Sequence, residues 1–185
     1  MKLFGLVMGA LLCTSLAFAG DSRTGLYASV GLGFDGGKVD AYSKSTPIGS
    51  SEIDAKGLQN FVVNGKIGFS PIENLAVYGV ASEALYMTFM GEDSHSLLYL
   101  GGGLSYWLPC DFFVAGSAGT VRFSSDDDSY SDDFGFGFRF SAGKDWRVFP
   151  WGSLGLEAFY EHAAVNGGDD WNGNLVGILF NVSYH

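Results

Sequence analysis

The stretch Phe134-Gly135-Phe136-Gly137-Phe138-Arg139-Phe140-Ser141 places four phenylalanines on one parity, with glycine, arginine and serine on the other. Side chains alternate between the two faces of a β-strand, so a strand here has one apolar wall and one small or charged wall. In a soluble sandwich the phenylalanines fill a core. In a membrane barrel they meet lipid and Arg139 points into the lumen. The rest of the chain favours the membrane barrel.

The start of the chain and its composition predict export to a membrane. Lys2, an apolar run and the A-x-A motif Ala17-Phe18-Ala19 predict a secretory signal peptide over residues 1–19, followed by a single domain over 20–185. Beyond this leader, no stretch has the roughly 18 uninterrupted apolar residues of a membrane helix. Glycine and aromatic residues are nevertheless abundant, with 28 glycines and 16% aromatic residues. The net charge of −10 argues against a nucleic-acid partner, because phosphate binding needs basic residues.

Eight alternating segments predict an all-β fold, an eight-stranded antiparallel up-and-down transmembrane β-barrel. Each segment has the length of a tilted membrane-spanning strand. Long polar connections alternate with short turns, which is typical of outer-membrane barrels with loops outside and turns in the periplasm. The expected strands are 24–34, 58–70, 75–88, 97–108, 112–123, 134–145, 153–162 and 174–185. The long connections are 35–57, 89–96, 124–133 and 163–173, and the short ones are 71–74, 109–111 and 146–152.

Charged residues within these segments indicate which face points inward. A basic side chain facing lipid at mid-bilayer costs about 2–4 kcal/mol, and an unpaired charge in a narrow lumen is also costly. We therefore expect these residues to point inward and to pair with one another. The predicted lumen charge network is Lys66, Glu83, Arg122, Arg139, Glu157 and Glu161. The third and fifth segments fit less cleanly, because Glu83 shares its parity with Val77 and Leu85, and a bulge could reset either register.

Aromatic residues gather near both ends of the expected strands. Trp and Tyr prefer membrane interfaces, because their rings are apolar while their polar atoms favour water. The predicted aromatic girdle comprises Trp107, Trp146, Trp151, Phe34 and Tyr86.

The last segment has one unbroken apolar face that ends in an aromatic residue. Its members are Val176, Ile178, Phe180, Val182 and Tyr184. This face is similar to the terminal strand that the barrel-assembly machinery recognises, although His185 follows the aromatic residue here.

With its leader and eight strands, the chain resembles the small barrel families typified by the OmpA transmembrane domain, OmpX and the opacity-type proteins. The resemblance covers the mature chain and lies in the pattern of alternation. It implies a monomer in the outer membrane, in contact with lipid and lipopolysaccharide, and the barrel-assembly machinery as a partner during biogenesis. We expect no peptidoglycan-binding domain after the barrel and therefore no OmpA-like tether to the cell wall.

A lipid A-modifying enzyme is the first alternative function. The deacylase type of small barrel uses a His, a Ser two residues later and a Glu near the rim. His162 and Glu161 resemble part of that set, but Ala164 stands where the serine is needed. A nucleophile must lie within hydrogen-bond reach of its base, so we expect no catalytic residue and no cofactor.

A narrow ion channel through the charged lumen is a second alternative, and a soluble lipocalin-like carrier is a third. The acidic stretch 126–133 could recruit a divalent cation through oxygen ligands. It lacks the spacing and turn glycine of an EF-hand, so we interpret it as a solvated loop and expect no metal site.

We expect a non-enzymatic integral outer-membrane barrel with a structural or surface-interaction role, in adhesion or envelope integrity. That role would be exerted through the long extracellular loops, chiefly 35–57, which could also contact an extracellular ligand. Eight strands leave an interior just filled by side chains, which argues against a general diffusion pore.

Overall fold

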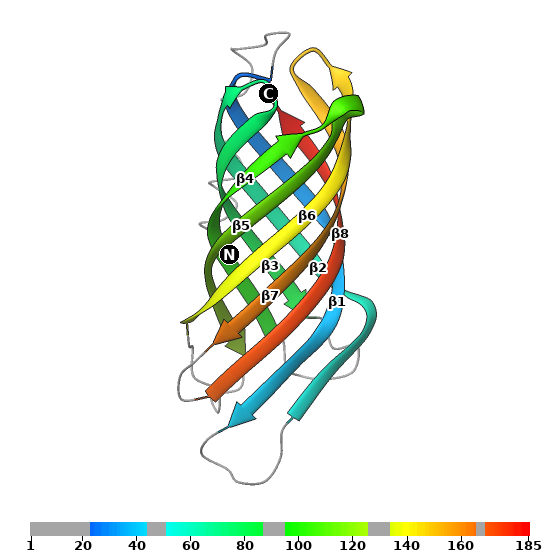
Figure 1. Cartoon of the computed structure of the whole chain (residues 1–185). Coiled ribbons are helices and arrows are strands. Elements are labelled where there is room, and N and C mark those ends of the chain that lie inside the picture. The colour runs from blue at the N-terminus through cyan, green and yellow to red at the C-terminus, as the bar shows by residue number, and fades with distance from the viewer. Residues whose placement is uncertain (1–22, 44–50, 87–94, 126–133, 166–168) are drawn as a thin grey trace.

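The computed structural model of the protein describes residues 23–43, 51–86, 95–125, 134–165 and 169–185. They form a closed barrel in which each strand pairs antiparallel with its neighbours in the order β1 to β8 (Figure 1). This confirms the predicted eight-stranded up-and-down barrel. The strands are β1 Gly25–Ser43, β2 Ser51–Ile72, β3 Leu75–Tyr86, β4 His95–Trp107, β5 Phe112–Ser125, β6 Phe134–Phe149, β7 Gly152–Val165 and β8 Asp169–Tyr184. A short 3-10 helix, η1 Pro109–Asp111, joins β4 to β5.

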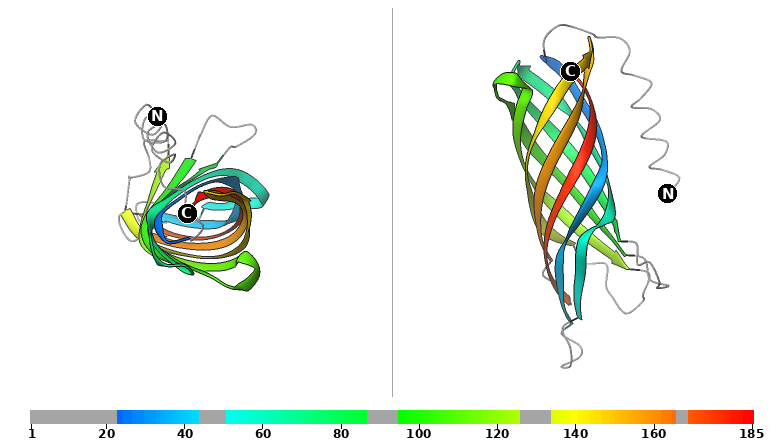
Figure 2. Two further views of the ribbon diagram at one scale, coloured as in Figure 1. Left: turned by 90° about the horizontal axis from the view of Figure 1, so that it is seen from above. Right: turned by 90° about the vertical axis from the view of Figure 1, so that its right-hand side faces the viewer.

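Closure of the barrel is set by the stagger of its strands. A walk along paired residues from Asn174 on β8 passes through every strand and returns to β8 at Tyr184, ten residues further along. With eight strands, such a shear goes with strands tilted by about 35–45° and an interior that side chains fill. The tilt is visible in Figure 1, and the view along the axis in Figure 2 shows the closed wall.

The outer wall is apolar, and it decides the orientation of the phenylalanine ladder. Phe134, Phe136 and Phe140 are 66%, 60% and 61% exposed, whereas Arg139 between them is buried. On β8, Phe180 is likewise 66% exposed. An apolar surface that encircles the barrel is far larger than a soluble monomer displays, so lipid covers it. The four rings of the ladder therefore face the membrane, as predicted.

Several strands extend further than expected, and the longest extensions are in β1, β2 and β8. β1 continues to Ser43 and β2 begins at Ser51, so much of the predicted loop 35–57 is a β-hairpin. β8 begins at Asp169 and pairs with β1 as far as Ser43. In Figures 1 and 2 this wall reaches beyond the other strands at the end opposite the C-terminus. Alternation in 35–57 is interrupted by glycines and by a register shift between Asp35 and Gly37, which concealed the strand in the sequence.

The opposite end has tight connections, as expected. Ile72 pairs with Leu75 across a short turn, and Phe149 pairs with Gly152. The turn predicted over 146–152 is shorter in the structure, because β6 continues to Phe149. At η1, Cys110 and Asp111 both have positive φ, 67° and 61°. Among the described residues, no helix is long and apolar enough to cross a bilayer. The predicted leader 1–19 lies outside the described residues.

Candidate functional site

Two buried ion pairs lie in the lumen. In the first, Lys66 of β2 places Nζ 2.8 Å from both carboxylate oxygens of Glu157 on β7. Asn181 of β8 donates its amide to the same carboxylate at 2.8 Å. The Lys66 ammonium also lies 5.5 Å from the centre of the Tyr78 ring. Each charge is thus compensated by its partner and by polar or aromatic neighbours, as burial requires.

The second pair joins neighbouring strands. Arg139 of β6 donates from Nε to Glu161 of β7 at 2.7 Å and from Nη2 to Ser82 of β3 at 2.8 Å. The guanidinium carbon lies 4.4 Å from the centre of the Phe159 ring and 5.4 Å from that of Tyr99. Arg139 and Glu161 are 5% and 2% exposed. The pair therefore ties β3, β6 and β7 together through the middle of the barrel.

The predicted lumen network is wrong for Glu83 and Arg122. On β3 the buried residues are the alternate positions Ala76, Tyr78, Val80, Ser82 and Ala84, which puts Glu83 on the outer face. On β5 Val121 is fully buried and Arg122 is half-buried on the outer face, 5.7 Å from the centre of the Phe134 ring. A bulge does not explain these two strands: β3 and β5 both pair continuously with β4, and the register shift of β3 against β2 lies at the turn end, between Phe69 and Ile72, away from Glu83.

Depth explains this correction. Glu83 and Arg122 lie near the loop ends of their strands, where the cost of a lipid-facing charge falls to about 0–1 kcal/mol. The mid-bilayer cost that holds Arg139 inside does not apply to them. Conversely, Asp35 and Asp145 are buried in the lumen. Neither residue belongs to the predicted network, although both alternate in step with the inward-facing residues of their strands.

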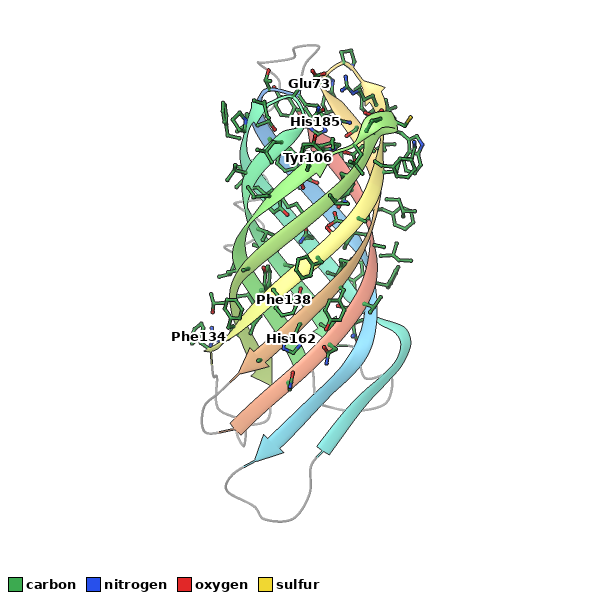
Figure 3. All side chains as sticks on the ribbon, viewed as in Figure 1. Glu73, Tyr106, Phe134, Phe138, His162 and His185 are labelled. Atoms are coloured by element: carbon green, nitrogen blue, oxygen red, sulfur yellow. The ribbon has the colours of Figure 1, made fainter. Side chains whose placement is uncertain are left out.

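The turn end of the barrel is closed by side chains from both ends of the described chain. His185 stacks on Tyr27 with ring centres 5.6 Å apart and meets the edge of Trp107 at 5.4 Å. Its Nε2 lies 3.1 Å from Ser153 Oγ. Arg23 binds Asp111 at 2.6 Å and lies over Trp107, 5.0 Å from its centre. In Figure 3 His185 lies at this end, across the molecule from His162.

Burial governs the protonation of this closure. Desolvation, reinforced by the charges of Arg23 and Arg147, lowers the pKa of His185 to about 3. Burial also lowers the pKa of the Arg23 guanidinium, and the Asp111 carboxylate partly offsets that effect. His185 is therefore neutral at physiological pH.

The lumen next to this closure is narrow. The space bounded by Trp107, Phe113 and Glu157 has no room for a water molecule. Its lining residues are Tyr27, Ser29, Trp107, Phe113, Asp145, Glu157, Asn181 and Ser183. This filling agrees with the expectation for eight strands.

The aromatic girdle is correct only in part. Trp146 is 48% exposed and Phe34 is 50% exposed, as interface residues on the outer wall should be. Trp151 is partly exposed and stacks on Phe149 with centres 4.9 Å apart. Trp107 was placed in the girdle wrongly, because it is 2% exposed and its indole donates to Asp145 at 2.8 Å inside the barrel. The side chain of Tyr86 lies outside the described residues.

The outward face of the terminal strand is largely as predicted. Val176, Ile178, Phe180 and Val182 are exposed on the lipid side. Tyr184 is instead buried, 6% exposed, next to the closure formed by His185.

The acidic stretch 126–133 lies outside the described residues. Within the described part of the chain, no cluster of three or more His, Cys, Asp or Glu side chains could hold a metal ion.

A polar ring marks the end of the apolar wall nearer the loops. The strands are tilted, so a row of paired residues runs obliquely around the barrel. Residues at the same depth in the membrane are therefore displaced by roughly one position from each strand to the next. With that shift, the outward polar residues of five strands lie within about two residues of one level. They are Glu83 on β3, Ser96 on β4, Arg122 on β5, His162 on β7 and Asn174 on β8.

His162 and Glu161 face opposite ways. Glu161 is in the lumen with Arg139, whereas His162 lies outside, with Nδ1 3.1 Å from Asn174 Oδ1 and its ring 5.1 Å from that of Phe138. Figure 3 shows Phe138 and His162 on the same side of the barrel. The wall thus separates the two residues that the lipid A-modifying alternative would combine.

No family model and no curated protein matches the chain. Solved structures do match, and each similarity shows the fold. Ail, the attachment invasion locus protein of Yersinia pestis, is 10% identical, with 85% of this chain and 99% of that chain covered and a TM-score of 0.51. Neisserial surface protein A is 16% identical, with 87% and 97% covered and a TM-score of 0.52. The outer membrane protein AlkL in lipid bilayers is 12% identical, with 91% and 93% covered and a TM-score of 0.52.

The closed barrel, its lipid-facing wall and these similarities define the class of the protein. It is a small, integral outer-membrane β-barrel of eight antiparallel strands.

Proposed function

We propose that this barrel is a non-enzymatic protein of the cell surface that acts by contact, in adhesion or in maintaining the envelope, rather than by transport or catalysis. One observation carries the proposal. The described lumen has no room for water near the turn end and its central charges are paired, while β1, β2 and β8 continue beyond the polar ring on the loop side. The chain thus extends its structure outside the membrane rather than opening a path through it.

The paired interior supports this role over a channel. Lys66 and Arg139 each have a carboxylate partner within the described lumen, and opening a path between them would separate buried charges. The separation of Glu161 from His162 by the barrel wall supports a role without catalysis. Among similar folds, Ail is named for attachment, which is compatible with the proposal at the level of the fold.

The test shortens the β1–β2 hairpin. Gly37 pairs with Ala55, so residues 38–54 can be replaced by an Asn-Gly turn without disturbing the pairing below. The matched control replaces 87–94 with Asn-Gly, because Tyr86 pairs with His95 across that connection. Both variants should show heat-modifiable migration on a denaturing gel, which reports a folded barrel.

We expect cells with the shortened β1–β2 hairpin to lose adhesion to surfaces or to leak periplasmic enzyme, while the control behaves as the parent. A folded variant with unchanged adhesion and leakage would contradict the proposal. Steady conductance steps from the parent barrel in planar bilayers would favour the channel instead. A mass change in lipid A incubated with purified barrel would favour the enzyme.

A further inference from the structure

The geometry points to a binding site on the lipid-facing wall for the sugar headgroup of an outer-leaflet glycolipid, formed by His162 and Asn174 beside Tyr160 and Phe138. The site is independent of the surface role proposed above. It lies on strands β6, β7 and β8, where His162 pairs with both Phe138 and Asn174 in the sheet.

A hydrogen-bonded cluster arranges these side chains. Asn174 Oδ1 accepts from the Tyr160 hydroxyl at 2.6 Å and lies 3.1 Å from His162 Nδ1. Since Oδ1 can only accept, Nδ1 must carry the proton in this contact. The Phe138 ring lies against the imidazole at 5.1 Å and an interplanar angle of 35°, which restrains its orientation.

The cluster leaves a defined pair of groups for a ligand. In the neutral imidazole with a proton on Nδ1, Nε2 is an acceptor. The Asn174 carbonyl oxygen is used within the cluster, so its amide group offers two N–H donors. A donor and an acceptor side by side match a hydroxyl group, which both donates and accepts. An unsubstituted acyl chain has no such group, and an ionised phosphate oxygen can only accept.

Depth decides which hydroxyls reach the site. His162 and Asn174 belong to the polar ring, at the level where the apolar wall ends and headgroups begin. Deeper in the membrane, the ring centre of Phe138 lies 5.5 Å from that of Phe140 and 6.3 Å from that of Tyr160. These rings offer an apolar surface for acyl chains directly beneath the polar cluster. A lipid whose sugar hydroxyls reach the polar cluster and whose acyl chains cover the aromatic rings fits both parts of the site.

A phosphate-bearing lipid is the competing occupant. Arg122, one strand further round on β5, lies over Phe134 and would attract a phosphate. The two lipid chemistries can be separated with three probes, which are lipid A, lipid A stripped of its phosphates, and phosphatidic acid. The purified barrel, refolded in detergent micelles, is titrated with each probe, and retained lipid is counted by native mass spectrometry.

We expect the parent barrel to retain one molecule of phosphate-free lipid A and to bind phosphatidic acid much more weakly. Asn174→Leu removes the donors and His162→Phe removes the acceptor while keeping a ring on Phe138. Each substitution should weaken the binding of phosphate-free lipid A by about tenfold, which corresponds to the loss of roughly one to two hydrogen bonds. Thr120→Val, an exposed outward residue on β5, is the matched control and should leave binding unchanged.

Three results would overturn the assignment. These are equal binding of phosphatidic acid that is lost in Arg122→Gln, parental affinity in both cluster variants, or equal weakening in Thr120→Val. Heat-modifiable migration checks that each variant has folded. His162→Phe provides the test if Asn174→Leu does not fold, because it leaves the Tyr160–Asn174 bond in place.

Discussion

Arg139 and Glu161, on adjacent strands, form a buried ion pair whose guanidinium also lies 4.4 Å from the Phe159 ring centre and donates to Ser82 on the far side of the lumen. Both partners have almost no contact with solvent. Neither can lose the other without leaving a charge in the interior, and this makes the pair the most direct test of the filled lumen.

Removing one member of this pair should destabilise the barrel far more than removing both. Arg139→Met leaves Glu161 buried and unpaired, which we expect to cost about 3–5 kcal/mol. The double variant Arg139→Met with Glu161→Leu replaces the charges by apolar groups and should recover most of that loss. Urea unfolding of the barrel in phosphatidylcholine vesicles measures both values. A cost below about 1 kcal/mol for the single variant would contradict a dry, paired lumen.

The cost of an added charge on the lipid-facing wall should depend on depth. Phe140 lies on β6 between the polar ring and Lys144 near the turn end, so Phe140→Arg puts a guanidinium near the bilayer centre. We expect it to destabilise the barrel by about 2–4 kcal/mol in vesicles. Thr120→Arg, near the polar ring, should cost only about 0–1 kcal/mol. Equal costs at the two positions would mean that the membrane is placed wrongly on the barrel.

The closure around His185 should make stability sensitive to pH. Its folded pKa is about 3, below the ordinary value of about 6.5. Between these values the unfolded state binds a proton that the folded state excludes, so stability falls as pH falls from about 7 toward 3.

Between pH 7 and 5 the loss from His185 should be roughly 1–2 kcal/mol. His185→Phe keeps a ring against Tyr27 and Trp107 and should remove this part of the pH dependence. Urea unfolding of parent and variant at pH 7, 6 and 5 measures it. Parallel curves for the two proteins would show that folding does not lower the pKa of His185.

Two tryptophans should differ in their contact with lipid. Trp146 is 48% exposed on the outer wall, whereas Trp107 is 2% exposed and donates to Asp145 inside the barrel. In variants that retain only one of them, brominated lipids should quench Trp146 strongly and Trp107 weakly. Equal quenching of the two would show that Trp107 contacts lipid, as the predicted girdle requires.

The sequence was sufficient for the barrel because alternation is strongest where the apolar parity faces lipid, as in Phe134 to Phe140. It was insufficient on β3, where Tyr78 and Val80 fill the lumen while Val77 and Leu85 meet lipid. There both parities are apolar, and Glu83 could not decide between them.

The candidate sites divide in the same way. Lys66 with Glu157 and Arg139 with Glu161 could be anticipated, because each charge interrupts an apolar strand well inside the membrane. Trp107 could not be placed, since an indole suits both an interface and a buried carboxylate partner such as Asp145. The cluster of Tyr160, His162 and Asn174 depends on the register between β7 and β8, which no local pattern encodes.

The pairing of β1 with β8 has a consequence for how this chain folds. Ala28 lies opposite Tyr184, so the seam joins the first and last strands of the protein. Contacts between such distant segments are slow to form, because closing a long loop costs entropy before any contact repays it. Until β8 arrives, both β1 and β7 are open edges that invite aggregation. A barrel that lacks β8 is therefore not a stable intermediate. The pairing of β8 with β1 is the step after which the whole chain is stably inserted in the membrane.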